Sequence, residues 1–189
     1  MKKISLLLVC IIAIANNSYA QRLIPGQRGL QISIGVPITE SNLFEQGNFT
    51  AEMAMTINHG RAKHLLFGIE YSKKYFGYSD MQIPSETTIF EGGYMLNLLS
   101  DARKTVLLNT GVTAAMGYET VNRNKKLLPD GSTLLAKDKF VYGGAYHLAL
   151  DIYASNSIVL FMKGKCNVLW GSDTEMFRPF LQTGVRIIF

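Results

Sequence analysis

The three histidines are the first residues of this chain that could carry acid–base chemistry. His147 and Asp151 are four residues apart, but the segment around them alternates with a period of two, which predicts a strand. Along a strand that separation is about 13 Å, too far for a base to hydrogen bond with its orienting carboxylate. His59 and His64 belong to a short turn, and no nucleophile stands out beside any of the three. We therefore interpret them as structural histidines and predict that the protein is not an enzyme.

Metal and cofactor chemistry has no better support in the composition. Cys166 is the one cysteine outside the first twenty residues, so the chain offers neither a Cys/His cluster for a metal nor a partner for an internal disulfide. The excess of basic over acidic residues falls from five to about three if Lys2 and Lys3 leave with a signal peptide, too few to predict nucleic-acid binding. We expect no metal, no cofactor and no direct nucleic-acid contact.

Eight charged side chains share the polar faces of alternating segments. The acids occupy the second to sixth segments and the bases the seventh and eighth, so closing a barrel would bring opposite signs face to face. Because unpaired charges are costly to desolvate, we expect these groups to pair across the interior. The predicted lumen charge network comprises Glu52, Glu70, Glu91, Glu119, Asp151, Lys163, Lys165 and Arg186. It predicts a plugged interior, with a small ion path as the alternative.

Eight segments of alternating apolar and polar residues supply the elements that would position these charges. They cover residues 30–36, 49–57, 65–72, 90–98, 108–119, 142–152, 158–170 and 181–189. Long and short connections alternate between them, and long loops are expected at 76–86 and 122–138. This layout predicts an antiparallel up-and-down barrel with long loops at one rim, and with tight turns and both termini at the other.

The chain begins with the features of a cleavable signal peptide. Lys2 and Lys3 precede an apolar run from Ile4 to Ala15, and small residues stand before Gln21. The run has about 12 residues against the roughly 20 that a transmembrane helix needs, so a retained anchor is the less favoured alternative. We expect residues 1–20 to be a signal peptide, 21–28 a periplasmic segment and 29–189 the barrel.

The fold class depends on which face of the strands points outward. A soluble lipocalin-like barrel would also have eight strands, but with its apolar face inside. Here the polar face is rich in Gly, Ala, Ser, Thr and Asn, which suit a cramped interior, and the other face is bulky at nearly every position. We therefore predict an all-β, eight-stranded antiparallel up-and-down β-barrel that contacts outer-membrane lipids.

The last strand and four aromatic residues agree with this prediction. The chain's end resembles the carboxy-terminal signal by which insertion machinery recognises bacterial outer-membrane barrels; the matching residues are Gln182, Gly184, Ile187 and Phe189. An open strand edge must be paired until the barrel closes, because unpaired amides in lipid are costly. The alternative is the core strand of a soluble protein. An interfacial aromatic belt is predicted beside the long loops, at Tyr71, Tyr118, Tyr142 and Trp170.

The loop at 122–138 contains a basic cluster and a turn signal, Pro129-Asp130-Gly131, so it is expected to project beyond the membrane. The cluster would touch lipopolysaccharide phosphates or a partner, or it would simply be solvated.

Several stretches resemble the TraO family of Bacteroidetes conjugative transposons, over nearly all of Gln21 to Phe189. They are Gln21-Arg22, Pro25-Gly26-Gln27, Gly29-Leu30, Glu91-Gly92-Gly93-Tyr94, Asp101-Ala102-Arg103-Lys104, Gly117-Tyr118-Glu119, Val168-Leu169-Trp170-Gly171, Asp173 and Phe177-Arg178-Pro179. The resemblance implies an outer-membrane component of a type IV secretion-like apparatus for transposon DNA transfer, with other apparatus proteins as partners and no catalytic residues. The alternative is a general OmpA- or OmpX-like surface barrel in adhesion or envelope stability.

Overall fold

The computed structural model describes residues 24–38, 47–60, 63–78, 81–125, 133 and 138–189. The predicted signal peptide therefore lies outside the described residues, as does most of the basic loop at 122–138. The strands are β1 (Arg28–Pro37), β2 (Phe49–Asn58), β3 (Lys63–Tyr78), β4 (Met81–Ser100), β5 (Val106–Val121), β6 (Lys139–Tyr153), β7 (Ile158–Trp170) and β8 (Phe177–Ile188). A short 3-10 helix, η2 (Asn122–Asn124), follows β5.

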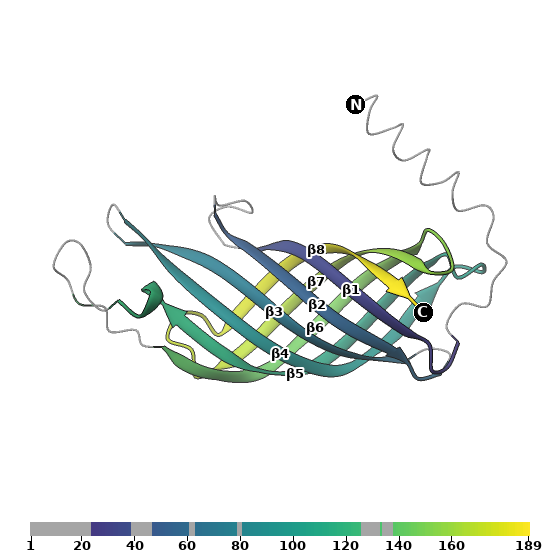
Figure 1. The fold of residues 1–189 in the computed structure, drawn as a ribbon, viewed down its shortest axis with the longest axis horizontal. Helices are drawn as coiled ribbons and strands as arrows, with labels where there is room; N and C mark the ends of the chain where they lie inside the picture. The colour runs from purple at the N-terminus through teal and green to yellow at the C-terminus, as the bar shows by residue number, and fades with distance from the viewer. Residues whose placement is uncertain (1–23, 39–46, 61–62, 79–80, 126–132, 134–137) are drawn as a thin grey trace, which may run out of the picture.

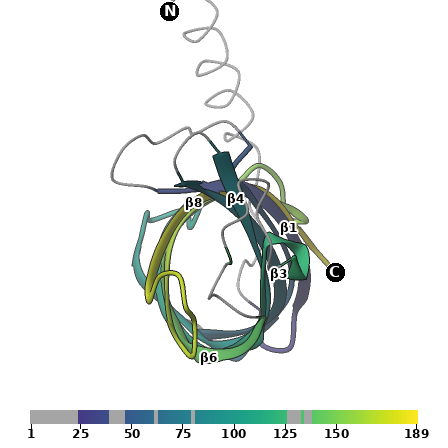
Figure 2. The same cartoon turned by 90° about the vertical axis from the view of Figure 1, so that its left-hand side faces the viewer.

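Each strand pairs antiparallel with its sequence neighbours, and β1 also pairs with β8, so the sheet closes into a barrel (Figure 1). The ring is visible when the molecule is turned to present one end (Figure 2). The predicted fold class, an eight-stranded antiparallel up-and-down barrel, is confirmed. At one end lie residues 58–60, 101–105 and 154–157 together with Phe189, and we call this end the tight-turn rim; the opposite end, with residues 171–176 and η2, is the loop rim.

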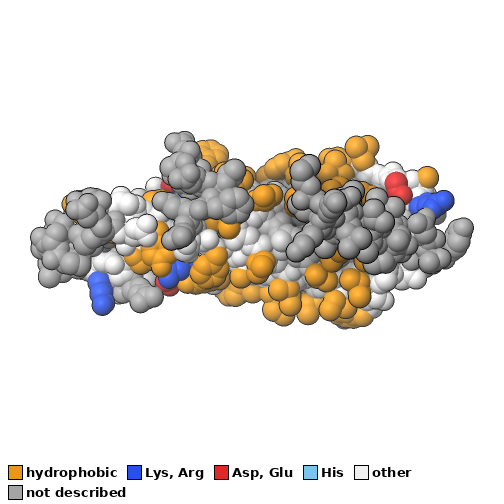
Figure 3. All heavy atoms as spheres, turned by 90° about the horizontal axis from the view of Figure 1, so that it is seen from above, with side chains coloured by type: hydrophobic (Ala, Val, Ile, Leu, Met, Phe, Trp, Pro, Cys, Tyr) orange, Lys and Arg blue, Asp and Glu red, His pale blue; other side chains and the backbone are white. Residues whose placement is uncertain are grey.

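Alternation along the strands sorts side chains between the inside and the outside, because successive side chains of a strand point to opposite faces. On β5, Asn109, Thr113 and Glu119 are buried inside, whereas Val112 and Met116 are exposed outside. Hydrophobic side chains dominate the middle of the surface seen in Figure 3, and the few charged side chains visible there lie toward the ends. The outer wall is thus apolar and the inner wall largely polar.

The connection between β3 and β4 differs from the sequence-based expectation. Instead of a long loop over 76–86, the two strands stay paired up to Tyr78 and Met81. Phe76 faces Ile83 across the pair, and such aromatic and β-branched cross-strand pairs stabilise a hairpin. The loop rim therefore carries a projecting β-ribbon at this point.

Candidate functional site

The eight residues of the predicted lumen charge network all have buried side chains on the inner wall. Their positions are Glu52 on β2, Glu70 on β3, Glu91 on β4, Glu119 on β5, Asp151 on β6, Lys163 and Lys165 on β7 and Arg186 on β8. Closure of the barrel places β7 and β8 opposite the acid-bearing strands, and the structure brings the charges together in three groups.

The largest group lies midway along the lumen around Lys165, whose side chain has no exposure. Its Nζ atom is 2.7 Å from Glu91 Oε1, 3.0 Å from Glu70 Oε2 and 3.4 Å from Glu52 Oε2. Lys163 donates to both carboxylate oxygens of Glu52, at 2.6 and 2.7 Å. Two ammonium groups from β7 thus connect three carboxylates from β2, β3 and β4 across the interior.

Neutral side chains complete this central group, and the sequence reasoning did not include them. Asn167 and Gln182 donate to Glu70 at 2.9 and 3.0 Å. Thr113 donates to Glu91 at 3.0 Å, and His147 Nε2 lies 3.4 Å from the same carboxylate and 2.9 Å from Thr113 Oγ1. The alternation predicts that these side chains face the lumen, but it does not predict their partners on other strands.

The cluster of Thr113, His147 and Glu91 is not arranged as a nucleophile–base relay. In such a relay the base contacts its nucleophile and its orienting carboxylate through different ring nitrogens. Here both neighbours contact Nε2 of His147. All three residues are also buried in the barrel interior. The arrangement therefore provides polar partners for the buried carboxylate of Glu91.

A second group lies nearer the tight-turn rim. Arg186 Nη1 donates to Asp151 at 2.7 Å, and Asn109 donates to the same carboxylate oxygen at 2.9 Å. Gln31 accepts hydrogen bonds from Arg186 and donates to Glu52 at 3.0 Å, which links this group to the central one. The guanidinium of Arg186 also stacks over the ring of Phe161, 5.5 Å from its centroid.

The third group closes the loop rim around Glu119 and involves Arg178, which the sequence analysis did not place in the network. Arg178 donates to Glu119, Ser172 and Thr174, so it ties β8 and the β7–β8 loop to β5. The expected eighth segment began at residue 181, and continuing its alternation toward the loop would have placed Arg178 on the inner wall. Two further ion pairs join the loop to β3 and β6: Lys74 with Glu175 at 2.6 Å, and Lys139 with Asp173.

Apolar clusters fill the lumen between and beyond the polar groups. Leu107, Tyr153, Val159 and Ile188 pack together at the tight-turn end, and Ile89, Ala115, Val141 and Leu169 form another cluster toward the loop rim. Ala115 follows Thr113 on the inner face of β5 and precedes Glu119, so this cluster separates the central group from the loop-rim group. Side chains therefore occupy the described lumen at each of these levels, as expected for eight strands.

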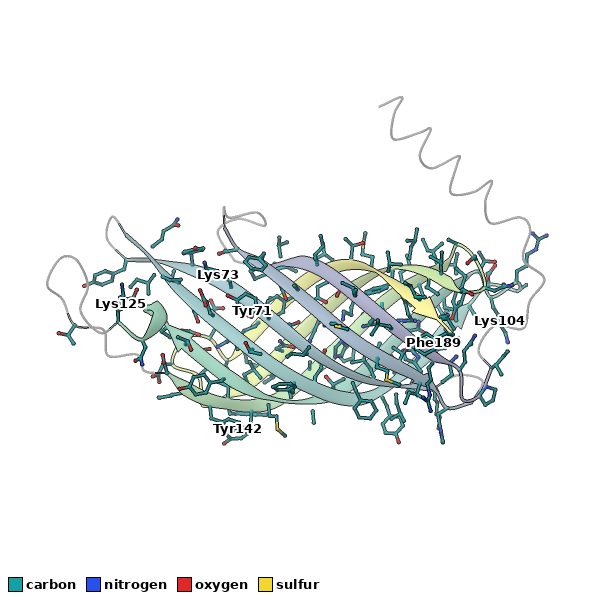
Figure 4. All side chains as sticks on the ribbon, in the orientation of Figure 1. Tyr71, Lys73, Lys104, Lys125, Tyr142 and Phe189 are labelled. Atoms are coloured by element: carbon teal, nitrogen blue, oxygen red, sulfur yellow. The ribbon has the colours of Figure 1, made fainter. Side chains whose placement is uncertain are left out.

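The predicted aromatic residues lie on the outer wall. Tyr118, Tyr142 and Trp170 are about half exposed, and the rings of Tyr142 and Trp170 are 6.4 Å apart. Tyr71 lies beside Phe49, with 5.7 Å between the ring centroids. Tyr142 points away from the barrel in Figure 4. This placement suits aromatic rings at the boundary between hydrocarbon and headgroups.

The four residues of the terminal motif divide between the two faces. Gln182 and Gly184 face the lumen, whereas Ile187 and Phe189 face outward. At the end of the chain, the backbone of Phe189 exchanges hydrogen bonds of 2.9 and 3.2 Å with Arg28 and so closes the seam between β8 and β1. A Cβ at Gly184 would lie 2.2 Å from the carbonyl oxygen of Ile32, so this position needs a glycine for steric reasons.

The described residues contain no group of three or more His, Cys, Asp or Glu side chains that could hold a metal ion. The same residues include no helix with the length and hydrophobicity of a transmembrane helix.

An apolar outer wall around a filled, charge-paired interior is the arrangement of a small outer-membrane β-barrel. Known structures agree with this class. The chain superposes on Neisserial surface protein A with a TM-score of 0.61 at 13% identity, covering 87% of this chain and 97% of that one. It superposes on Ail, the attachment invasion locus protein of Yersinia pestis, with a TM-score of 0.56 at 10% identity, covering 88% and 100%. At these identities the likeness shows the fold alone.

The family follows from the sequence. The conjugative transposon protein TraO family matches residues 24–189, and the chain belongs to this family. The resemblance predicted from the short motifs is thereby confirmed. A comparison with curated proteins found no match.

Proposed function

We propose that this protein is an outer-membrane component of the apparatus that transfers a conjugative transposon between cells, with a structural or interaction role. Family membership supports a role in conjugative transfer, and the apolar outer wall supports a location in the outer membrane. In this proposal residues 1–20 direct export, the loop rim faces outward, and both termini lie in the periplasm.

The observation that carries the structural role is the filled lumen. Lys165 and its three carboxylate partners span the interior, and apolar clusters lie at other levels of it. A barrel filled in this way offers no conduit for DNA, so its partners bind at the rims. Those partners are other proteins of the transfer apparatus, and no direct nucleic-acid contact is part of the proposal.

The terminal strand and the aromatic belt have roles in biogenesis and placement. Strand β8, directly before Phe189, pairs with β1 in the closed barrel, so before closure it is an open edge that must be protected. This supports recognition of the last strand by the insertion machinery. The half-exposed rings of Tyr118, Tyr142 and Trp170 support a belt that fixes the depth of the barrel in the membrane.

Deleting the gene in a donor strain and measuring transfer frequency tests the role in conjugation. We expect transfer to fall and to be restored by the wild-type gene, but not by an unrelated eight-stranded barrel expressed at the same level. Unchanged transfer would contradict the proposal. Cell fractionation with heat-modifiable gel migration tests the location, because recovery as a freely soluble periplasmic protein would exclude the membrane placement.

A general surface barrel in adhesion or envelope stability is the second candidate. It is favoured by the fold shared with a Yersinia pestis protein named for attachment and invasion. A shared fold does not carry function, so family membership takes precedence. Loss of surface attachment with normal transfer in the deletion strain would favour this candidate.

A further inference from the structure

Two grooves of similar size cut into the outer wall of the barrel. One has a volume of about 460 Å³ and lies over β3 to β6, with Lys63, Tyr94, Val112 and Tyr146 among its lining residues; we call it the Lys63 groove. The other, of about 510 Å³, lies over β1, β2, β7 and β8 and includes Met162; we call it the Met162 groove. Both volumes fall within the range of about 300–1,000 Å³ typical of small-molecule sites.

The Lys63 groove has an apolar body. Val112 forms its floor, because it is paired with Tyr94 on one side and Tyr146 on the other and is exposed outside the barrel. The hydroxyl groups of Tyr146 and Thr110 are hydrogen bonded at 2.8 Å, which holds the Tyr146 ring in the groove wall. Two tyrosine rings thus flank a shallow channel of aliphatic side chains.

The mouth of this groove is cationic and lies at the tight-turn rim. Lys63 is the first residue of β3, and it faces Leu96 on the outer wall next to the exposed His59. No carboxylate of the described residues forms an ion pair with Lys63. The loop-rim lysines Lys74 and Lys139 differ in this respect, since each is paired with an acidic residue of the β7–β8 loop.

The whole tight-turn rim shares this positive charge. The exposed ionisable side chains at this end, among the described residues and apart from His59, are Arg28, Lys63, Arg103 and Lys104 against the single acid Asp101. Lys104 lies at the same end of the barrel as Phe189 in Figure 4. The Met162 groove, by contrast, has no titratable residue in its lining.

We propose that the Lys63 groove binds one anionic glycerophospholipid of the leaflet at the tight-turn rim. An acyl chain lies along Val112 between the two tyrosines, and the phosphate meets Lys63 and His59. A lipid fits better than a protein segment because the groove continues the apolar outer wall, and its one charged end coincides with the end of a strand, where hydrocarbon gives way to headgroups. This inference rests on the membrane placement proposed above.

Native mass spectrometry of the purified full chain tests the site, with equal amounts of phosphatidylglycerol and phosphatidylcholine of the same chain length as probes. We expect the wild-type barrel to retain phosphatidylglycerol about fivefold better, as a single lysine near a lipid phosphate would provide. Lys63→Gln should reduce this preference to about onefold, and Lys63→Arg should keep it. Val112→Trp, which fills the floor of the groove, should reduce retention of both lipids.

Two matched controls separate the site from the general properties of the barrel. Arg28→Gln removes a cation from the same rim outside the groove, and Met162→Trp fills the other groove; both should keep the phosphatidylglycerol preference. Heat-modifiable migration verifies that each variant is folded. If Lys63→Gln does not fold, the lipid retention of Val112→Trp tests the groove instead. Equal retention of the two lipids by the wild type would overturn the inference, as would a preference that survives Lys63→Gln or lipid retention that Val112→Trp leaves unchanged. If the lipid-binding test fails but the barrel still fractionates with the outer membrane, only the lipid site is contradicted. If the protein is absent from the outer membrane, the proposed function is contradicted as well.

Discussion

Replacing Lys165 by methionine is the sharpest test of the charge-paired lumen. The substitution keeps a long side chain but removes the ammonium group that contacts Glu52, Glu70 and Glu91. Each carboxylate retains another partner: Lys163 for Glu52, Asn167 and Gln182 for Glu70, and Thr113 for Glu91. The decrease in unfolding free energy is therefore not three times that for a single ion pair. Removing one partner of a buried ion pair costs about 3–5 kcal/mol, and we expect a decrease in unfolding free energy within that range.

The measurement is reversible urea unfolding of the barrel in phospholipid vesicles, followed by the fluorescence of Trp170, the only tryptophan of the chain. With a slope of about 1–3 kcal/mol per molar urea, the midpoint should fall by at least about 1 M. Lys73→Met is the matched control, because Lys73 contacts Glu86 at 3.7 Å at the partly exposed loop rim. Such a pair contributes about 1 kcal/mol or less.

A double-mutant cycle assigns the loss to the lumen contacts. Glu91→Gln should cost less stability in the Lys165→Met background than in the wild type, because that background has no buried ammonium group that would lose its carboxylate partner. The reasoning would be refuted if Lys165→Met shifted the midpoint no more than Lys73→Met. That result would mean that water, and not Lys165, solvates the three carboxylates.

Three further predictions concern the loop rim, the seam and the terminus. Arg178→Gln should increase protease cleavage within residues 171–176 while leaving heat-modifiable migration intact, since Arg178 fastens that loop; unchanged cleavage would contradict this role. Gly184→Ala should lower the unfolding free energy by about 1–3 kcal/mol through overpacking. Gly77→Ala should leave the unfolding free energy unchanged, because no atom lies within 4 Å of the added carbon. Equal effects of the two substitutions would count against the steric argument. Phe189→Asp should reduce the amount inserted in cells more than the yield of folding in detergent, and equal losses would argue against an insertion signal.

The alternation along each strand was enough to predict the barrel and the orientation of its side chains. Whether a strand residue faces inward or outward is a local property, because neighbouring side chains alternate on a pleated backbone. Small residues on one face and bulky apolar residues on the other then indicated that lipid lies outside. The inward charges, including Glu70 and Lys165, could be identified for the same reason.

The positions at which the strands begin and end were less predictable. Sequence reasoning placed a loop at 76–86, between the third and fourth alternating segments, but pairing of Phe76 with Ile83 keeps the hairpin intact. The cross-strand contact that decides this lies outside any single segment. Arg178 was missed for a related reason, because the last strand continues beyond its clearest apolar alternation.

The tertiary structure alone decided which groups meet. The distance from Lys165 to three carboxylates on other strands depends on the stagger of the closed sheet, and alternation says nothing about stagger. Stagger also brings Lys63, Tyr94 and Tyr146 around one groove. The sequence determined the face on which each side chain lies, since that is set by neighbouring bonds; closure of the barrel determined its partners, since those come from strands far away in the chain.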